Sequence, residues 1–337
     1  MTKVQNKIDR SNLLQIIKGS PNQLLIGFEL AKDIKFNKKF TGIVLNGMGG
    51  SALPAELIQL FLDQEKKTKP FTIEINRNYD LSVKRIDNNK LNIFSSYSGN
   101  TEETLSSLKQ GLKMKLPIII MASGGKLQKI AEKKNLPLIK IPTGVQPRMA
   151  LGYTFGALLR VLNNLNVSQV KKADLESDVL KVNRLFTSFN KKTKEVSSKI
   201  KNKTPIVYSS WNWKSLAMIW KIMINENGKT PAFWNFFPEL NHNEMVGFTK
   251  QNAAFHLLIL KDSSDHPSNL KRVDLTEKLL RKFKVSSSLF EIPKGPTIFK
   301  IFASLQFGCL ISYHLAIMNK EDPTPVKMVE TFKKNME

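Results

Sequence analysis

Short apolar runs alternate with segments of helical period between residues 40 and 165, and this alternation restricts the folds open to the chain. The runs predict five strands, at 42–45, 71–75, 91–95, 118–121 and 138–141. Strands that alternate with helices form a parallel sheet, because each helix carries the chain back to the same edge. The runs are apolar at almost every position, which indicates burial on both faces. The sequence therefore predicts an α/β fold with a doubly wound parallel sheet.

A second region of alternation follows Pro205. Its apolar runs predict strands at 206–208, 232–236, 255–260 and 288–292, with helices at 214–225, 275–283 and 299–318. Residues 166–203 are rich in lysine and serine, are helical in period and contain no strand pattern. A chain of 337 residues has the length of about two domains. We predict an N-terminal domain at 1–165 with an N-terminal helical extension, a helical connector at 166–203, and a C-terminal domain of similar design at 204–337.

The chain is strongly basic, with 52 Lys and Arg residues against 28 Asp and Glu residues and a net charge of +24. Such an excess can indicate binding to nucleic acid or to an acidic membrane surface. The lysines are scattered, however, and the densest run, at 190–203, lacks the aromatic residues that single-strand binders use. Nucleic-acid binding is therefore a rival interpretation, and we expect neither nucleic acid nor membrane as a partner.

Cysteine usage and the amino terminus bear on the compartment. The single cysteine, Cys309, rules out a disulfide framework, and no histidine has metal-ligand spacing from another histidine or cysteine, so no metal is expected. Residues 1–23 are polar and lack the apolar stretch of a signal peptide, which favours a cytoplasmic location. Residues 301–318 approach the length of a membrane span, but the polar side chains among them indicate a buried core or subunit-interface helix.

A cluster of hydroxyl side chains follows the third predicted strand. Ser96, Ser98 and Thr101 surround Gly99, where a helix is predicted to begin near Thr101. A helix start directs unpaired N–H groups and the positive end of its dipole at one point, which suits a phosphate. The alternative is an ordinary capping box that only starts the helix.

A glycine-rich loop at 46–52 follows the first predicted strand and precedes a helix predicted at 53–62. Gly47, Gly49 and Ala52 also fit a dinucleotide fingerprint, so a nicotinamide-dependent oxidoreductase is an alternative. That fingerprint requires an acidic residue at the end of the next strand, where this chain has Asn76. Loops after neighbouring parallel strands meet in one crevice, so one phosphorylated ligand fits both loops better. The predicted phosphate-binding residues are Gly49, Gly50, Ser51, Ser96, Ser98 and Thr101.

Six separated blocks carry a resemblance to a known family. They are Gly-Met-Gly-Gly-Ser-Ala at 47–52, Ser-Tyr-Ser-Gly-Asn-Thr-Glu-Glu-Thr at 96–104, Pro-Arg at 147–148, Asn-Glu-Asn at 225–227, Pro-Glu-Leu-Asn-His-Asn-Glu at 238–244 and Asp-Pro-Thr-Pro-Val at 322–326. In this order they resemble the bifunctional phosphoglucose/phosphomannose isomerases of the sugar isomerase (SIS) superfamily. The resemblance implies two flavodoxin-like SIS domains, a homodimer, no cofactor, and reversible conversion of glucose 6-phosphate or mannose 6-phosphate into fructose 6-phosphate. The preferred aldose and the physiological direction stay open.

The resemblance also implies roles for four residues. Glu226 corresponds to the base that moves a proton between C1 and C2 through a cis-enediolate, and Arg148 to the cation that stabilises the enediolate. His242 corresponds to the group that opens the sugar ring in the neighbouring subunit's site. Lys333, in the C-terminal tail, corresponds to a lysine near the ring oxygen. Active sites are accordingly expected between the domains and across the dimer seam.

Alternatives remain for these roles and for the function. Lys327 or Lys334 could replace Lys333, and Glu239 or Glu244 could replace Glu226. A non-catalytic SIS protein that senses a phosphosugar would need the hydroxyl cluster but no catalytic set in the C-terminal half.

Overall fold

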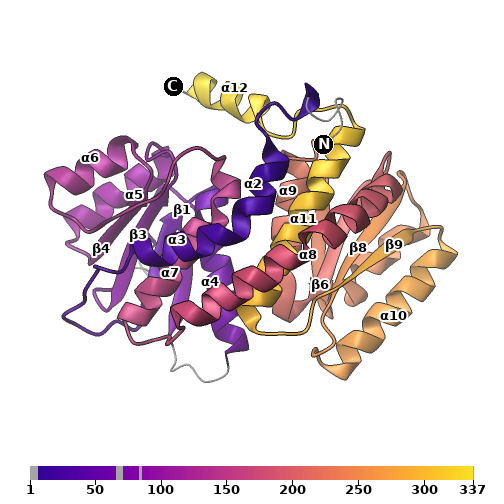
Figure 1. Cartoon of the computed structure of the whole chain (residues 1–337), viewed down its shortest axis with the longest axis horizontal. Coiled ribbons are helices and arrows are strands. Elements are labelled where there is room, and N and C mark those ends of the chain that lie inside the picture. The colour runs from indigo at the N-terminus through magenta and orange to yellow at the C-terminus, as the bar shows by residue number, and fades with distance from the viewer. Residues whose placement is uncertain (1–6, 66–70, 83–85, 337) are drawn as a thin grey trace. The chain divides into compact units, whose positions relative to one another are not determined.

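The computed structural model describes residues 7–65, 71–82 and 86–336. The chain divides into two compact units (Figure 1). The N-terminal unit contains residues 19–180, and the C-terminal unit contains residues 181–337 together with the segment before residue 19. Each unit is built on its own parallel sheet flanked by helices, which confirms the predicted α/β fold class.

The N-terminal unit contains a five-stranded parallel sheet in the order β2-β1-β3-β4-β5. The five predicted strands are confirmed: β1 Gly42–Gly47, β2 Thr72–Asn76, β3 Lys90–Ser96, β4 Ile118–Ala122 and β5 Leu138–Lys140. The helices are α3 Gln23–Leu30, α4 Leu53–Gln64, α5 Glu102–Lys113, α6 Gly125–Lys133 and α7 Leu151–Asn164. Helix α2 Leu13–Gly19 precedes them in the chain and belongs, up to residue 18, to the C-terminal unit. This strand order is that of flavodoxin-like folds. Strand β2 is added on one side of β1, and β3, β4 and β5 are added on the other, so the order of strands reverses between β1 and β3.

Helices cover both faces of this sheet. The chain moves one way along the sheet through α4 and the other way through α5 and α6, so right-handed crossovers place them on opposite faces. Leu108 of α5 and Leu127 of α6 are buried in one cluster with Phe94 of β3. On the other side α7 packs against α3 so closely that a Cβ at Gly156 would lie 2.3 Å from the Leu24 carbonyl oxygen.

The C-terminal unit repeats the design with four parallel strands in the order β7-β6-β8-β9. The predicted strands are again confirmed, as β6 Thr204–Ser210, β7 Phe233–Phe237, β8 Phe255–Lys261 and β9 Ser286–Glu291. The helices are α9 Lys214–Glu226, α10 Pro267–Lys282, α11 Thr297–Met318 and α12 Lys327–Met336. Val273 and Leu280 of α10 are buried against one face of the sheet, and α9 and α11 pack together.

The apolar helix α11 lies in the core of the C-terminal unit. Residues 298–316 are buried except Lys300, and a Cβ at Gly308 would lie 2.5 Å from the Trp220 indole of α9. Among the described residues α11 alone has the length and composition of a membrane span, and 89% of its most apolar window is buried. The prediction of a buried core helix is thus confirmed.

Two helix starts differ from the predictions. Because proline suits the first turn of a helix, Pro147 predicts a helix from there to about residue 164. The helix begins instead at Leu151, because Pro147 opens a separate 3₁₀ turn, η4, Pro147–Met149. Helix α10 begins at Pro267, eight positions before the predicted 275, because Pro267 occupies the first turn and His266 accepts a hydrogen bond from Ser268 N. Pro267 lies outside the apolar period that defined the start predicted at 275, whereas Pro147 was itself the signal for the other predicted start and belongs to a turn that precedes the helix.

The segment predicted as a connector contains one long helix, α8 Lys172–Ile200. The chain passes from one compact unit to the other inside this helix, after residue 180. The domain bounds at 165 and 204 therefore stay predictions, whereas the helical character of the segment is observed.

Candidate active site

The candidate site begins at the loops that follow β1 and β3 in the N-terminal unit. These strands are neighbours, and their chain continuations run to opposite sides, which opens a crevice at the carboxyl edge of the sheet. The first loop leads into a short 3₁₀ turn, η2 Gly49–Ser51, and the second leads into α5. The Tyr97 backbone N–H donates a 3.0 Å hydrogen bond to Ser51 Oγ and so joins the two loops.

Ser96 contacts both other hydroxyls of the predicted cluster. It is 1% exposed, and its Oγ lies 2.8 Å from Thr101 Oγ1 and 3.4 Å from Ser98 Oγ. It also accepts a 3.1 Å hydrogen bond from the Gly99 N–H. Ser98 is exposed and Thr101 is half-buried. The three hydroxyls therefore meet as predicted, with Ser98 and Thr101 on the accessible side and Ser96 beneath them.

Thr101 occupies the N-cap position of α5 without capping it. Its φ of −63° and ψ of 121° are those of an N-cap residue, but its side chain makes no hydrogen bond to the first turn of the helix. Its hydroxyl bonds to Ser96 instead. The capping-box alternative is therefore not what the structure contains, and side-chain capping by Thr101 does not satisfy the N–H groups at the start of α5.

Two glycines are required where backbone segments approach closely. Gly99 has a φ of +69°, and a Cβ there would lie 1.8 Å from the Gly124 carbonyl oxygen. A Cβ at Gly50 would lie 2.7 Å from the Arg148 nitrogen. This contact brings η4 and its Arg148, which is only 2% exposed, against the first loop.

The N-terminal unit thus gathers seven of the ten predicted site residues around one crevice. They are Gly49, Gly50, Ser51, Ser96, Ser98, Thr101 and Arg148. The strand that a dinucleotide site would use ends in Asn76, whose side-chain amide donates to Ser107 Oγ. Glu74, the one acidic residue of β2, forms an ion pair with Lys90. The ribose ligand of a dinucleotide fingerprint therefore has no counterpart at the end of β2.

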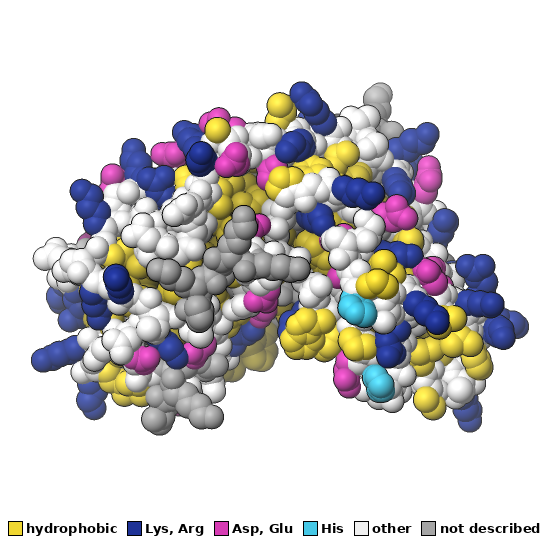
Figure 2. Space-filling model, turned by 90° about the horizontal axis from the view of Figure 1, so that it is seen from below, with side chains coloured by type: hydrophobic (Ala, Val, Ile, Leu, Met, Phe, Trp, Pro, Cys, Tyr) yellow, Lys and Arg dark blue, Asp and Glu magenta, His cyan; other side chains and the backbone are white. Residues whose placement is uncertain are grey.

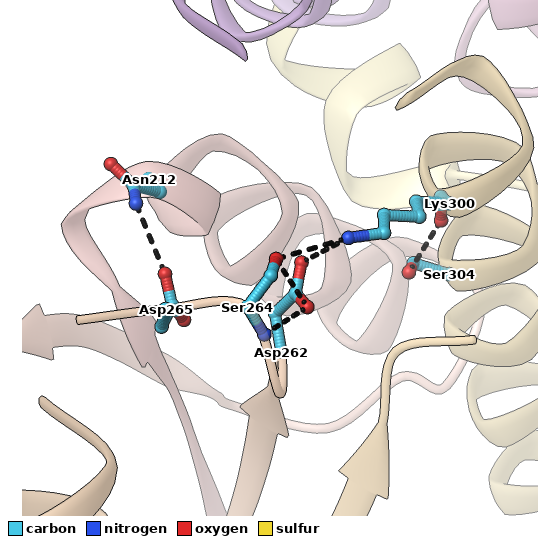
Figure 3. Close-up of polar contacts among 6 residues, drawn as sticks. All are labelled: Asn212, Asp262, Ser264, Asp265, Lys300 and Ser304. Atoms are coloured by element: carbon cyan, nitrogen blue, oxygen red, sulfur yellow. Dashed lines mark hydrogen bonds and ion pairs between the residues drawn. The ribbon is translucent and has the colours of Figure 1, made fainter. Parts of the chain in front are cut away.

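The corresponding edge of the C-terminal sheet has the opposite chemistry (Figure 3). The loop after β8 carries Asp262 and Asp265, and Lys300 of α11 binds Asp262 with Nζ 2.7 Å from Oδ2. Asp265 accepts a 3.0 Å hydrogen bond from Asn212, and burial raises the pKa of its carboxyl. Two carboxyl groups in this loop disfavour a phosphate, so the loop differs in chemistry from the hydroxyl cluster of the N-terminal unit.

Glu226 is the last residue of α9, as predicted from the helical period. It is half-buried, and its own carbonyl oxygen accepts a 2.5 Å hydrogen bond from Lys229 Nζ. The same ammonium lies 2.6 Å from the Pro325 carbonyl oxygen. The local sequence does not single out Lys229, because its partner Pro325 lies almost a hundred residues further along the chain.

His242 ends a 3₁₀ turn, η6 Glu239–His242, and is followed by a second, η7 Glu244–Thr249. It is exposed, and its imidazole makes no hydrogen bond with any residue that the structure describes. Glu244 anchors this segment, because its Oε1 accepts a 2.5 Å hydrogen bond from the Tyr208 hydroxyl and its Oε2 accepts one from Asn235. Burial and the nearby Glu244 raise the pKa of Tyr208, so the phenol stays a donor.

The other three histidines have structural surroundings. His256 lies between the hydroxyls of Ser286 and Ser288, and burial lowers its pKa to about 4. Burial also lowers the pKa of His314 to about 4. His266 caps α10. Within the described ranges no group of three His, Cys, Asp or Glu side chains could hold a metal ion.

The remaining candidate, Lys333, lies on α12 together with Lys327 and Lys334. All three are exposed, and none forms a hydrogen bond or ion pair with a described residue. The structure therefore does not choose among the three lysines.

Comparison of the sequence with those of known proteins identifies the family of this chain. The chain is 34% identical over 340 aligned residues to the bifunctional phosphoglucose/phosphomannose isomerase of Caldicellulosiruptor bescii, covering 96% of this chain and 98% of that protein. The chain belongs to the bifunctional phosphoglucose/phosphomannose isomerase family. Residues 189–336 of this family member also match the bacterial phospho-glucose isomerase C-terminal SIS domain.

Two further similarities are to a relative with a different named activity and to a solved structure. The isomerase-family chain is 36% identical over 239 residues to the D-glucosamine-6-phosphate 4-epimerase of Sulfolobus acidocaldarius, covering 70% of this chain and 74% of that protein. Its fold is similar to that of the tagatose-6-phosphate ketose/aldose isomerase of Escherichia coli, with a TM-score of 0.71, 14% identity, and coverage of 92% of this chain and 93% of that chain.

Proposed function

We propose that this chain interconverts fructose 6-phosphate with glucose 6-phosphate, mannose 6-phosphate or both. The observation that carries the proposal is the hydroxyl cluster at the β1/β3 edge, where Thr101 leaves the start of α5 uncapped by its side chain. Such a helix start binds a phosphate through backbone N–H groups and the helix dipole. The family membership supports the same reaction class.

The predicted roles follow from the chemistry that aldose–ketose conversion needs. Glu226 moves the proton between C1 and C2, and the guanidinium of Arg148 stabilises the enediolate oxygens. His242 opens the ring, and Lys333 lies near the ring oxygen. Both oxygens of Glu244 already accept hydrogen bonds from Tyr208 and Asn235, which disfavours Glu244 as the base.

A coupled assay tests the reaction itself. The enzyme is offered fructose 6-phosphate, and glucose 6-phosphate and mannose 6-phosphate are both quantified while solvent deuterium is followed at C1 and C2. Formation of either aldose supports the proposal. Tight binding of fructose 6-phosphate without exchange or turnover would instead support the phosphosugar sensor, and a nicotinamide signal in the absorbance spectrum would support the oxidoreductase.

A second candidate is epimerisation of an amino-sugar phosphate. The 36% identity to a protein named D-glucosamine-6-phosphate 4-epimerase, slightly above the identity to the bifunctional isomerase, favours testing it. Incubation with glucosamine 6-phosphate, followed by proton NMR, distinguishes the two reactions. A new 4-epimer without any conversion of fructose 6-phosphate would favour the epimerase.

The proposed phosphate cradle consists of the hydroxyls of Ser96, Ser98 and Thr101 and the start of α5, and it gives a prediction about KM. Replacing Ser98 and Thr101 together by alanine removes two accessible hydroxyls, each worth about 1.5–3 kcal/mol in a bond to a charged group. We expect KM for fructose 6-phosphate to rise at least about tenfold, with a small change in the midpoint of thermal unfolding. A matched control replaces Ser188 and Ser198, whose hydroxyls bond only to carbonyls within α8. An unchanged KM would remove the cradle from the proposal.

We further propose a cytoplasmic homodimer in which His242 serves the partner's site. Its exposure and lack of hydrogen bonds to described residues leave it available to a second copy. Mixing inactive Glu226→Gln and His242→Ala chains and exchanging subunits should restore activity, because each heterodimer contains one site with both groups intact. Verified heterodimers that stay inactive would assign both residues to one subunit's site.

A further inference from the structure

The ammonium of Lys229 binds backbone carbonyls from two separate segments of the C-terminal unit. Nζ lies 2.5 Å from the carbonyl oxygen of Glu226, 2.6 Å from that of Pro325 and 3.4 Å from that of Pro323. A lysine ammonium has three donors and no acceptor, so three carbonyls match its capacity. The contact joins the carboxyl end of α9 to the Asp-Pro-Thr-Pro-Val block that precedes α12.

Comparison with similar lysines shows that this contact is particular to residue 229. Four lysines have a left-handed backbone: Lys115, Lys229, Lys284 and Lys320, with φ between +50° and +61°. Each follows the end of a helix, where asparagine or glycine would serve the backbone as well. Among the described residues, only Lys229 of these four has its ammonium hydrogen-bonded to carbonyl oxygens. A turn requirement alone therefore does not explain the lysine.

We propose that Lys229 is a positioning residue for the isomerisation. Its ammonium joins the backbone of Glu226 to residues 323–325. It thereby fixes the position of the base relative to the start of α12, the helix that carries the C-terminal lysines. The inference rests on the proposed function, because it takes Glu226 as the base and α12 as the source of the C-terminal lysine.

The energetics favour this reading. The helix α12 buries none of its described residues, and Met328 is 87% exposed, so side-chain packing within the unit holds it weakly. Proline fixes φ at residues 323 and 325, and the ammonium then fixes where their carbonyls point. Hydrogen bonds to a charged donor are stronger than neutral ones, which makes Lys229 an effective tie for this segment.

The test compares Lys229→Met with Lys320→Met. Both substitutions keep the aliphatic stem and remove the charge at a left-handed position, and Lys320 is exposed with no hydrogen bond from its ammonium to a described residue. We expect Lys229→Met to lower kcat for fructose 6-phosphate about 10- to 100-fold, as small misplacements of catalytic groups do. KM should change less than about twofold, because the phosphate cradle lies on other residues.

Two readouts separate positioning from a general loss of structure. Amide hydrogen exchange across 327–336 should quicken in Lys229→Met and stay unchanged in Lys320→Met. In a Lys229→Gly variant, n-butylammonium should restore part of kcat, whereas tetramethylammonium, which has no N–H donor, should not. If both methionine variants retain wild-type kcat, or if kcat falls while exchange across 327–336 is unchanged, Lys229 is not a positioning residue.

The outcomes also separate this inference from the proposed function. If Glu226→Gln is inactive and Lys229→Met is not impaired, only the inference fails. If the wild-type chain shows no isomerisation, the proposed function fails, and with it the positioning role, whatever the exchange data show for α12.

Discussion

We expect a Glu226→Gln variant to bind fructose 6-phosphate almost as well as the wild type and to turn it over at least about 100-fold more slowly. Glutamine keeps the size and reach of the side chain but removes the carboxylate that accepts the proton. The proposed phosphate contacts lie on Ser98, Thr101 and the start of α5, so binding should survive. Steady-state kcat and solvent-deuterium exchange at C1 and C2 should fall together.

A Glu239→Gln variant is the matched control. Glu239 is exposed in the same region of the unit, and its carboxylate accepts a 2.9 Å hydrogen bond from Asn243, which glutamine can also accept. We expect its kcat to stay within about threefold of the wild type, as is usual for surface substitutions that keep their contacts. Near wild-type turnover by Glu226→Gln would transfer the base to Glu244 or Glu239.

The largest expected effect on stability comes from Lys300. Its side chain is 13% exposed and pairs at 2.7 Å with Asp262, which is 2% exposed (Figure 3). In a Lys300→Met variant the Asp262 carboxylate would stay buried without its cation, and breaking a buried pair in this way costs about 3–5 kcal/mol. Chemical denaturation should therefore show a lower free energy of unfolding by about that amount.

An exposed ion pair of the same unit provides the comparison. Lys261 lies 2.7 Å from Asp274, whose side chain is 64% exposed, so Lys261→Met should cost less than about 1 kcal/mol. A double variant, Lys300→Met with Asp262→Asn, should recover part of the lost stability, because the uncompensated charge is gone. Equal effects of Lys300→Met and Lys261→Met would show that burial does not make the Lys300 pair special.

The positive charge is not gathered at one place on the face of the molecule that Figure 2 shows. Figure 2 shows lysine and arginine side chains spread over the visible face of both units, with acidic side chains among them. This distribution agrees with the scattered lysines of the sequence and differs from the stripe expected of a nucleic-acid binder.

Local pattern was sufficient for the strands and for the ends of the best-defined helices. The nine strands could be predicted because a strand that is buried on both faces is apolar at consecutive positions. The end of α9 could be predicted to within one residue from the helical period of its apolar side chains. The start of α10 was misplaced, because Pro267 and a capping contact of His266 decide it and not apolar period. The start of α7 was misplaced, because Pro147 opens a separate 3₁₀ turn before the helix.

The sequence by itself determined the α/β class, the two loops at neighbouring strand ends, and the hydroxyl and glycine residues of the proposed phosphate site. Only the tertiary structure decided how those residues are used. Thr101 looks like a helix cap in sequence, but its hydroxyl bonds to Ser96, and Gly50 is required by its contact with Arg148. The Lys229 and Lys300 contacts join segments far apart in the chain. Such contacts depend on strand register and crossover geometry, which no local run of residues records.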